Sequence, residues 1–284
     1  MATPDRDLKD KTYVVTGANT GIGKETVRAL AARGARVVLA SRSADKTRPV
    51  IAELARATGN DRLEFLALEL DSLASVRASA AELLARDLPI HCLINNAGIA
   101  GVRGLTKDGF ELTFGTNHLG HFLFTTLLLD RIRASGPARI VNVSSASHYQ
   151  AKGLDWDAVR KPTRTTTGML EYARSKLANV LFTRELARRI PASEVTNYAL
   201  HPGVIASDIW QRRLPRFLAA IPKLFMKSTA DGAKTSIYCA TSPECASHNG
   251  RFYSDSKEKK ANRVADDEAL AAELWQRSEE WTKA

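Results

Sequence analysis

The sequence predicts an α/β protein with a doubly wound parallel sheet of about seven strands flanked by helices, folded as one domain over residues 1–284. Short runs of β-branched and aliphatic residues alternate with segments of helical spacing, which is typical of parallel strands covered on both faces. No linker rich in Pro, Gly or Ser, no repeat and no low-complexity tract divides the chain. The predicted strands are Thr12 to Thr16, Arg36 to Ala40, Leu63 to Leu68, Cys92 to Asn95, Arg139 to Val143 and Val195 to Leu200.

The C-terminal part adds the last elements of this pattern. A short strand over Gly250 to Tyr253 is expected to close the edge of the sheet. The polar run Ser254 to Arg263 is expected to be a solvated loop, and Asp266 to Trp281 a terminal helix. The whole chain is therefore predicted to contribute to one sheet and its helices.

Charge and cysteine content restrict the classes of partner. Lys and Arg number 41 against 31 Asp and Glu, a net charge of +10. The excess positive charge is spread over many helices without a nucleic-acid-binding motif, so no nucleic-acid partner is expected.

The three cysteines form no paired framework, and the first residues hold no apolar signal segment, so the expected location is cytoplasmic. The apolar stretch Leu119 to Leu129 is too short to span a bilayer.

A glycine-rich turn follows the first predicted strand directly. Glycines at this point permit a sharp turn, a backbone close to a pyrophosphate and tight contact between helix and strand. The spacing Gly-x-x-x-Gly-x-Gly would in isolation also fit a simple tight turn, but its place between strand and helix favours a dinucleotide site. The candidate cofactor-binding residues of this turn are Gly17, Asn19, Thr20, Gly21, Ile22 and Gly23.

The end of the second strand predicts the form of the cofactor. An acidic side chain there would bind the ribose hydroxyls of NAD, but the chain has Ser41 and Arg42. The planar guanidinium of Arg42 suits a 2′-phosphate, so NADP(H) is preferred over NAD(H); the alternative is a merely solvated Arg42. The ends of the next strands add further candidate cofactor contacts, Asp71, Asn95, Ala97 and Gly98.

Tyr172 and Lys176 predict a catalytic pair, because residues four apart share one face of a helix. A cation about 5 Å from the phenol would lower its pKa by about 2 and bring it toward neutral pH, where acid and base catalysis is efficient. Such a pair by itself is more often two solvent-exposed residues without a catalytic role. However, Ser145 ends an upstream strand, where ligands of such sheets bind.

Taken in order, these motifs resemble the short-chain dehydrogenase/reductase family and its Rossmann-type fold from about Lys11 to Tyr253. Within the family, the segment from Asn117 to Phe122, the long gap from Ser145 to Tyr172 and the residues after Ser175 look like the retinol dehydrogenase group. The motifs that carry the resemblance are TGANTGIG, NNAG, Asn117, Ser145 with YARSK, and His201-Pro202-Gly203.

The resemblance implies the catalytic roles. Tyr172 would exchange a proton with the substrate oxygen, and Ser145 would hydrogen-bond that oxygen. Lys176 would lower the pKa of Tyr172 and hold the nicotinamide ribose, while Asn117 would fix a water in the proton relay. It also implies cofactor contacts from Tyr172, Lys176, Pro202, Gly203 and Ser207.

Two segments are expected to shape substrate choice. Residues 146–170 look like an insertion at the pocket mouth, and residues 204–228 correspond to the substrate lid of the family. Within the lid, residues 209–227 are basic and amphipathic, so peripheral contact with a membrane surface is an alternative compatible with the lid.

The histidines carry weaker hypotheses. His118 and His121 lack a third ligand of suitable spacing, so packing is favoured over a metal site and no metal is predicted. His148 follows the serine strand, where lining the pocket and a structural role are equally compatible with its position.

The sequence therefore predicts a soluble NADP(H)-dependent oxidoreductase that interconverts an alcohol and an aldehyde or ketone on a small apolar substrate, in the reducing direction. Retinal-like, steroid and aliphatic carbonyls are the candidate substrates. The alternatives are a sensor or scaffold that binds NADP(H) without turnover, and a peripheral membrane protein that docks through residues 209–227. The family often forms homo-oligomers, but no surface pattern in the sequence establishes one.

Overall fold

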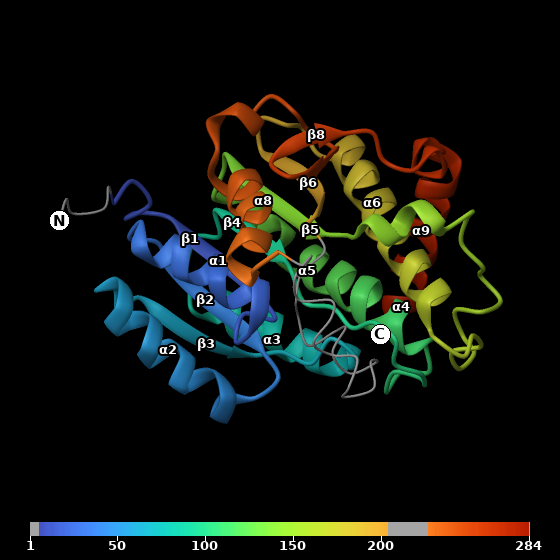
Figure 1. Ribbon diagram of the computed structural model, residues 1–284, viewed down its shortest axis with the longest axis horizontal. Coiled ribbons are helices and arrows are strands. Elements are labelled where there is room, and N and C mark those ends of the chain that lie inside the picture. The colour runs from blue at the N-terminus through green and yellow to red at the C-terminus, as the bar shows by residue number, and fades with distance from the viewer. Residues whose placement is uncertain (1–5, 204–226, 284) are drawn as a thin grey trace.

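Eight strands form one sheet, and the first seven run parallel (Figure 1). The computed structural model describes residues 6–203 and 227–283. The strands are β1 Thr12–Thr16, β2 Arg36–Ser41, β3 Leu63–Ala67, β4 Cys92–Asn95, β5 Ala138–Val143, β6 Val195–His201, β7 Arg251–Ser254 and β8 Lys257–Lys259.

The strand order, β3-β2-β1-β4-β5-β6-β7-β8, is that of a doubly wound sheet. The chain runs outward from β1 through β2 to β3, returns to pair β4 with β1, and then continues in the opposite direction. The point where the direction reverses leaves a crevice at the carboxyl ends of β1 and β4, where ligands of open α/β sheets bind.

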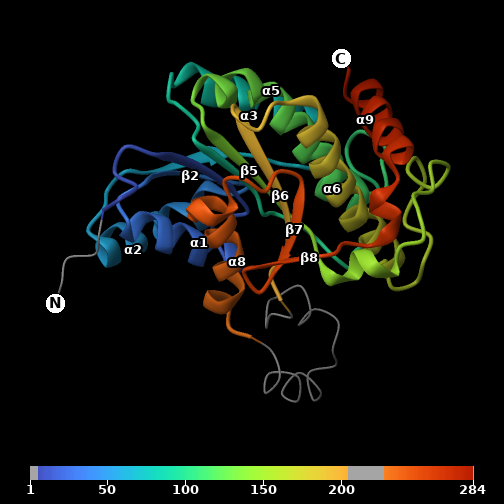
Figure 2. The ribbon, with the colours of Figure 1, turned by 90° about the horizontal axis from the view of Figure 1, so that it is seen from above.

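Helices cover both faces of the sheet, with α1, α2 and α8 on one side and α3, α5 and α6 on the other (Figure 2). The helices are α1 Gly21–Ala32, α2 Ala44–Thr58, α3 Leu73–Ala85, α4 Leu112–Phe114, α5 Gly120–Ala134, α6 Met169–Arg189, α8 Thr229–Thr241 and α9 Glu268–Thr282. Shorter turns are the π-helix η1 Gly115–Leu119 and the 3₁₀-helices η2 Ala146–Gln150, η4 Pro243–Cys245 and η5 Arg263–Asp266.

Burial on both faces explains why the strands are continuous apolar runs. In β1, Val14 packs into the core beneath α3 and α5, whereas its neighbours Tyr13 and Val15 pack beneath α1. Successive side chains of a strand point to opposite faces, so a strand covered on both sides needs an apolar residue at nearly every position. The predicted fold class is confirmed, and the predicted strands up to β6 agree with the structure to within one residue at each end.

The edge of the sheet corrects two expectations. The described residues form eight strands, and the eighth, β8, lies inside the run Ser254 to Arg263 that the sequence predicts as a solvated loop. Asp255 and Ser256 both have positive φ, 52° and 57°, as a tight type I′ hairpin turn requires, and the turn pairs β8 antiparallel with β7. Asp-Ser is an uncommon sequence for this turn and β8 is fully exposed, so neither turn chemistry nor an apolar pattern signalled the strand.

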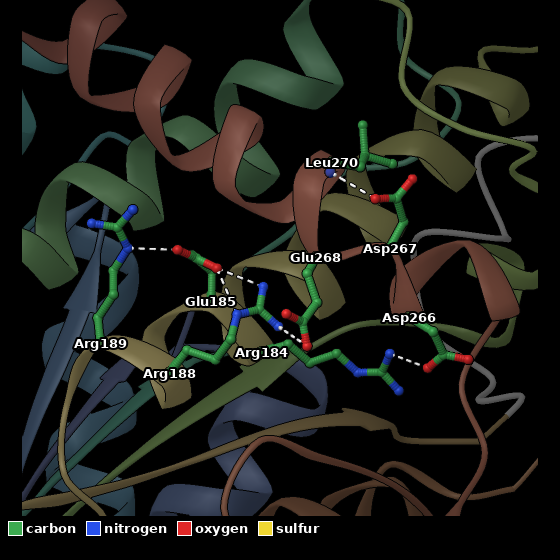
Figure 3. Close-up of polar contacts among 8 residues, drawn as sticks. All are labelled: Arg184, Glu185, Arg188, Arg189, Asp266, Asp267, Glu268 and Leu270. Atoms are coloured by element: carbon green, nitrogen blue, oxygen red, sulfur yellow. Dashed lines mark hydrogen bonds and ion pairs between the residues drawn. The ribbon is translucent and has the colours of Figure 1, made fainter.

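The predicted terminal helix is α9, which packs against α6. Asp267 caps its first turn by accepting a backbone N–H at 2.9 Å. Arg184 of α6 pairs with Asp266, and Arg188 lies 3.9 Å from Glu268, so ion pairs hold the start of α9 against α6 (Figure 3).

The two segments expected to control the substrate differ in how far the structure describes them. Residues 146–170 begin with η2 and then run without long helix or strand to the start of α6. The predicted lid, 204–228, lies outside the described residues except for Lys227 and Ser228, as does nearly all of the amphipathic stretch 209–227. No helix in the described ranges is long and apolar enough to cross a membrane.

Candidate active site

A cavity of about 700 Å³ opens at the crevice between β1 and β4. Its walls come from the loops that follow β1 to β6 and from α6, so segments distant in sequence meet there. Most predicted cofactor residues line it: Gly17, Asn19, Thr20, Gly21, Ile22, Gly23, Ser41, Arg42, Asp71, Ala97, Gly98, Tyr172, Lys176 and Pro202.

The glycine turn lines the cavity at the start of α1. Gly17 and Gly21 have φ of 63° and 55°, a backbone conformation that favours glycine. A Cβ on Gly23 would lie 2.3 Å from the Gly17 carbonyl oxygen, so α1 packs closer to the turn than any side chain permits. In the described part of the chain, the Thr20 side chain makes no capping bond to α1. The backbone N–H groups at the start of α1 are thus free to bind an anion.

The end of β2 has a cation and no carboxylate. Arg42 is exposed, lines the cavity and makes no hydrogen bond or ion pair to any described residue. Ser41 is buried, and its hydroxyl lies 2.6 Å from that of Thr47. Since Thr47 donates its own hydrogen to the Ser43 carbonyl, Ser41 donates to Thr47. Arg42 is therefore the group at this end of the cavity that can bind an added phosphate.

Asn95 is a predicted cofactor residue that does not line the cavity, and Gly203 is another. Asn95 is the last residue of β4 and is 1% exposed, with its amide donating to Thr125 and Asn142 at 2.9 Å each. The neighbouring Asn96 lines the cavity instead, and its side chain donates to the Thr16 carbonyl at 2.8 Å. The alternation of side chains along β4 was the signal that could have separated the two asparagines.

Tyr172 and Lys176 lie on one face of α6 and both border the cavity. The Lys176 Nζ atom lies 5.6 Å from the centre of the Tyr172 ring and donates to the Val143 carbonyl at 2.9 Å. Burial lowers the pKa of Lys176 to about 8, so the ammonium form still predominates at neutral pH. Gly98 lets the lysine approach, because a Cβ there would lie 3.2 Å from Nζ.

The pKa of Tyr172 moves opposite to the predicted direction. Burial raises the pKa of the Tyr172 phenol, and a hydrogen bond with the Ser145 side chain offsets part of that rise. Lys176 lies beside the Tyr172 ring and would lower the pKa of the phenol. At this buried position the cost of forming a phenolate away from water is larger, so the pKa rises. The phenol is therefore held in its protonated form.

Ser145 and Asn117 lie behind the cavity lining and support it. Ser145 is the N-cap of η2, and its Oγ accepts from the Ser147 backbone N–H at 3.2 Å. Asn117 sits in the π-helix η1, a distortion often found at functional sites. Its side chain bonds to both the N–H and the carbonyl of Ile99, at 2.8 and 2.9 Å, and donates to Ser175 at 3.0 Å. The side chain of Asn117 is thus engaged in fixing the loop beside Gly98.

The remaining predicted residues fall in three places. Gly203 follows Pro202 with φ of 100°, and Ser207 lies outside the described residues. His148 has a structural role, because its ring bonds to the Ser145 carbonyl at 2.6 Å and accepts from the Asn262 N–H at 3.1 Å. In residues 6–203 and 227–283 no cluster of three or more potential metal ligands occurs.

One wall of the cavity was missed by the sequence. Four residues between the end of β4 and the first turn of η1 extend the cavity beyond Tyr172 and Lys176, and no sequence motif marked them. These residues are Ile99, Val102, Leu112 and Thr116.

The family model described as short chain dehydrogenase matches residues 11–155. The chain belongs to the short-chain dehydrogenase/reductase family, whose members are oxidoreductases that use NAD(P)(H). It is 42% identical to retinol dehydrogenase 12 of Mus musculus, over 97% of this chain and 87% of that protein. It is 41% identical to retinol dehydrogenase 13 of Homo sapiens, over 95% of this chain and 84% of that protein. The resemblance drawn from the sequence is thereby confirmed.

Solved structures agree with this placement. A putative uncharacterized protein from Mycobacterium paratuberculosis has a TM-score of 0.77 and 36% identity, covering 98% of this chain and 96% of that one. A 3-ketoacyl-(acyl-carrier-protein) reductase from Brucella melitensis, complexed with NADH, has a TM-score of 0.67 at 22% identity, covering 87% of this chain and 97% of that one. At that identity the second structure supports the fold alone.

Proposed function

We propose that the protein is an NADP(H)-dependent oxidoreductase that reduces an aldehyde or ketone on an apolar substrate, with Tyr172 as the proton donor. The observation that carries the proposal is that Tyr172 and Lys176 border the same cavity as the open N-terminus of α1. A dinucleotide whose pyrophosphate lies on that helix end would place its far end beside the two side chains.

The cavity residues fit such a cofactor. The glycine turn offers unpaired backbone N–H groups to the pyrophosphate, Lys176 can hold the nicotinamide ribose, and Arg42 can bind a 2′-phosphate. The bound cofactor would supply the hydride, and the protein supplies position, charge and the proton. An exposed Arg42 without a described partner supports NADP(H) over NAD(H).

The protonation state of Tyr172 supports the reducing direction. Its pKa is raised by burial, so the phenol carries its hydrogen at neutral pH and can donate it to a carbonyl oxygen that gains negative charge. In the proposed mechanism the Ser145 side chain, which lowers the pKa of Tyr172, holds the same oxygen. The buried ammonium of Lys176 would stabilise the phenolate that remains.

The lining supports an apolar substrate. Ile99, Val102, Leu112 and Val143 present aliphatic side chains to the cavity. Such a surface binds hydrocarbon by releasing water and excludes water from the reacting atoms. The relatives named retinol dehydrogenases make retinal the first compound to try, ahead of steroid ketones and medium-chain aldehydes.

NADPH consumption over such a panel, compared with Tyr172→Phe, tests the proposal. Loss of a general acid lowers kcat by roughly 10²- to 10⁴-fold, and NADPH binding should stay within about twofold because the ring is kept. Tyr238→Phe is the matched control, since Tyr238 lies on α8 with its hydroxyl bonded to Glu244 at 2.7 Å. Equal rates for the Tyr172→Phe variant and the wild type would refute the proton-donor role. Tight NADPH binding without turnover of any carbonyl would favour the alternative of an NADP(H) sensor.

A further inference from the structure

His121 links the cofactor turn, here Thr16, Asn96 and Ala97 at the ends of β1 and β4, to the π-helix η1 that carries Asn117. It is the second residue of α5, is 3% exposed, and bonds through both ring nitrogens. Its Nε2 atom lies 2.9 Å from the Thr16 hydroxyl, and its Nδ1 atom lies 3.0 Å from the Asn117 carbonyl oxygen. The sequence motifs gave His121 no role beyond packing.

The hydrogens of this link can be assigned from their partners. The Thr16 hydroxyl oxygen accepts from the backbone N–H groups of Asn96 and Ala97, at 2.9 Å each, so its own hydrogen is left to donate to His121 Nε2. A ring that accepts at Nε2 carries its hydrogen on Nδ1 and donates to the Asn117 carbonyl. Burial, with Lys176 nearby, lowers the pKa of His121 to about 4, which agrees with a neutral ring.

The link joins the ends of β1 and β4 to the backbone of η1. At one end, Thr16 holds the turn at Asn96 and Ala97, both of which line the cavity. At the other end, Asn117 fixes the loop at Ile99 and contacts Ser175 beside Lys176. The side chain at position 121 therefore sets the distance between the cofactor turn and the catalytic side of the cavity.

We propose that His121 is a positioning residue, which holds the cofactor turn through Thr16 and the Asn117 backbone through Nδ1. The proposal rests on the proposed function, because it assigns the two bonds to cofactor affinity and to turnover respectively. His121 acts through these neighbours and does not touch the substrate. The nearby His118 differs, since its Nε2 bonds to Ser278 of α9 at 3.0 Å, away from the turn.

Two substitutions separate the two bonds. The amide nitrogen of Asn reaches about as far as Nδ1 of histidine, so His121→Asn keeps the donor to Asn117 and loses the acceptor for Thr16. The longer amide of Gln reaches about as far as Nε2, so His121→Gln keeps the acceptor for Thr16 and loses the donor to Asn117. A buried hydrogen bond corresponds to about 3- to 10-fold in an equilibrium or rate constant.

We expect a split between affinity and rate. His121→Asn should weaken NADPH binding about 3- to 10-fold, measured by NADPH fluorescence, and leave kcat within about twofold. His121→Gln should do the reverse, and His121→Phe should show both losses. Tyr198→Phe is the control for losing one buried hydrogen bond elsewhere, since the hydroxyl of Tyr198 in β6 donates to the Cys245 carbonyl of η4 at 2.6 Å.

The proposal is overturned if both half-variants change affinity and rate together, or if neither differs from Tyr198→Phe. Long-range ¹H–¹⁵N spectra of the wild-type protein with NADPH give an independent measurement, expected to show the ring hydrogen on Nδ1 at neutral pH; a hydrogen on Nε2 would contradict the assignment. Absence of turnover by the wild type with every carbonyl would defeat the proposed function, while the NADPH affinities and the spectra would still test His121.

Discussion

At the scale of single residues, the site combines a buried cation with a buried neutral acid. Lys176 is 3% exposed and Tyr172 8%, so both lose most of their contact with water. Burial lowers the pKa of the lysine and raises the pKa of the tyrosine, which makes the uncharged form of each easier to reach. A proton donor needs that arrangement: a phenol that stays protonated before reaction and an ammonium close enough to stabilise the phenolate afterwards.

The buried ammonium should leave a measurable trace in the pH dependence of stability. The pKa of Lys176 is about 8 in the folded protein against a reference value of 10.5, so between these pH values the unfolded chain binds more protons. The unfolding free energy of the wild type should therefore rise with pH across that window, by about 3 kcal/mol in total, relative to Lys176→Met. Denaturant titrations from neutral to alkaline pH measure the difference, with the exposed Lys152→Met as control. Parallel pH profiles for the wild type and the Lys176→Met variant would disprove the buried charge.

The sequence predicted the positions of these residues better than the pKa of Tyr172. The glycine turn, the Tyr172 and Lys176 pair and Arg42 all reach the cavity, because each is tied to a strand end or to one helix face. The direction of the Tyr172 pKa depends on how deeply neighbouring segments bury the ring, which spacing along one helix does not contain. Asn95 was misplaced because the motif contains two adjacent asparagines, and the alternation of side chains along β4 turns the first of them into the core.

At the scale of elements, α9 is held to the rest of the molecule by both polar and apolar contacts. The ion pairs near its start lie on the surface, where each contributes about 0–1 kcal/mol. Its inner side places Trp275 against Phe122 of α5 and Phe182 of α6, at ring separations of 5.1 and 5.8 Å. The guanidinium of Arg189 lies 4.4 Å from the centre of the Trp275 ring. The apolar contacts should therefore dominate the attachment of α9.

Replacement of Trp275 tests this attachment. Trp275→Ala should cost about 3–5 kcal/mol of unfolding free energy, because it opens a cavity between α5, α6 and α9. Trp275→Phe should recover much of the loss, since the indole N–H has no partner among the described residues. The matched control is Gln276→Ala on the exposed side of α9, expected within ±0.5 kcal/mol or so. A loss below about 1 kcal/mol for Trp275→Ala would show that the surface ion pairs hold the helix.

At the scale of the whole molecule, the sequence predicted the sheet and its covering helices but missed the last strand, β8. Strands buried on both faces are continuous apolar runs in the sequence. The ends of β1 to β6 could therefore be predicted from the sequence. The exposed β8, Lys257–Lys259, has no apolar pattern, because none of its side chains is buried. β8 is the edge strand of the sheet. Its charged residues discourage pairing with a strand of another chain.

Cofactor binding connects the site to the stability of the whole fold, because the cavity draws on the loops after six strands. A ligand that binds only the folded chain at 100 times its Kd stabilises it by about 2.7 kcal/mol. NADPH should therefore raise the midpoint of thermal unfolding by several degrees, and NADH at equal concentration should raise it less, because only NADPH offers a 2′-phosphate to Arg42.

Arg42→Ala should lower NADPH affinity by about 10- to 100-fold and leave NADH affinity unchanged, whereas the exposed Arg48→Ala should match the wild type. If NADH stabilises the wild type as well as NADPH does, the cofactor preference assigned to Arg42 is wrong.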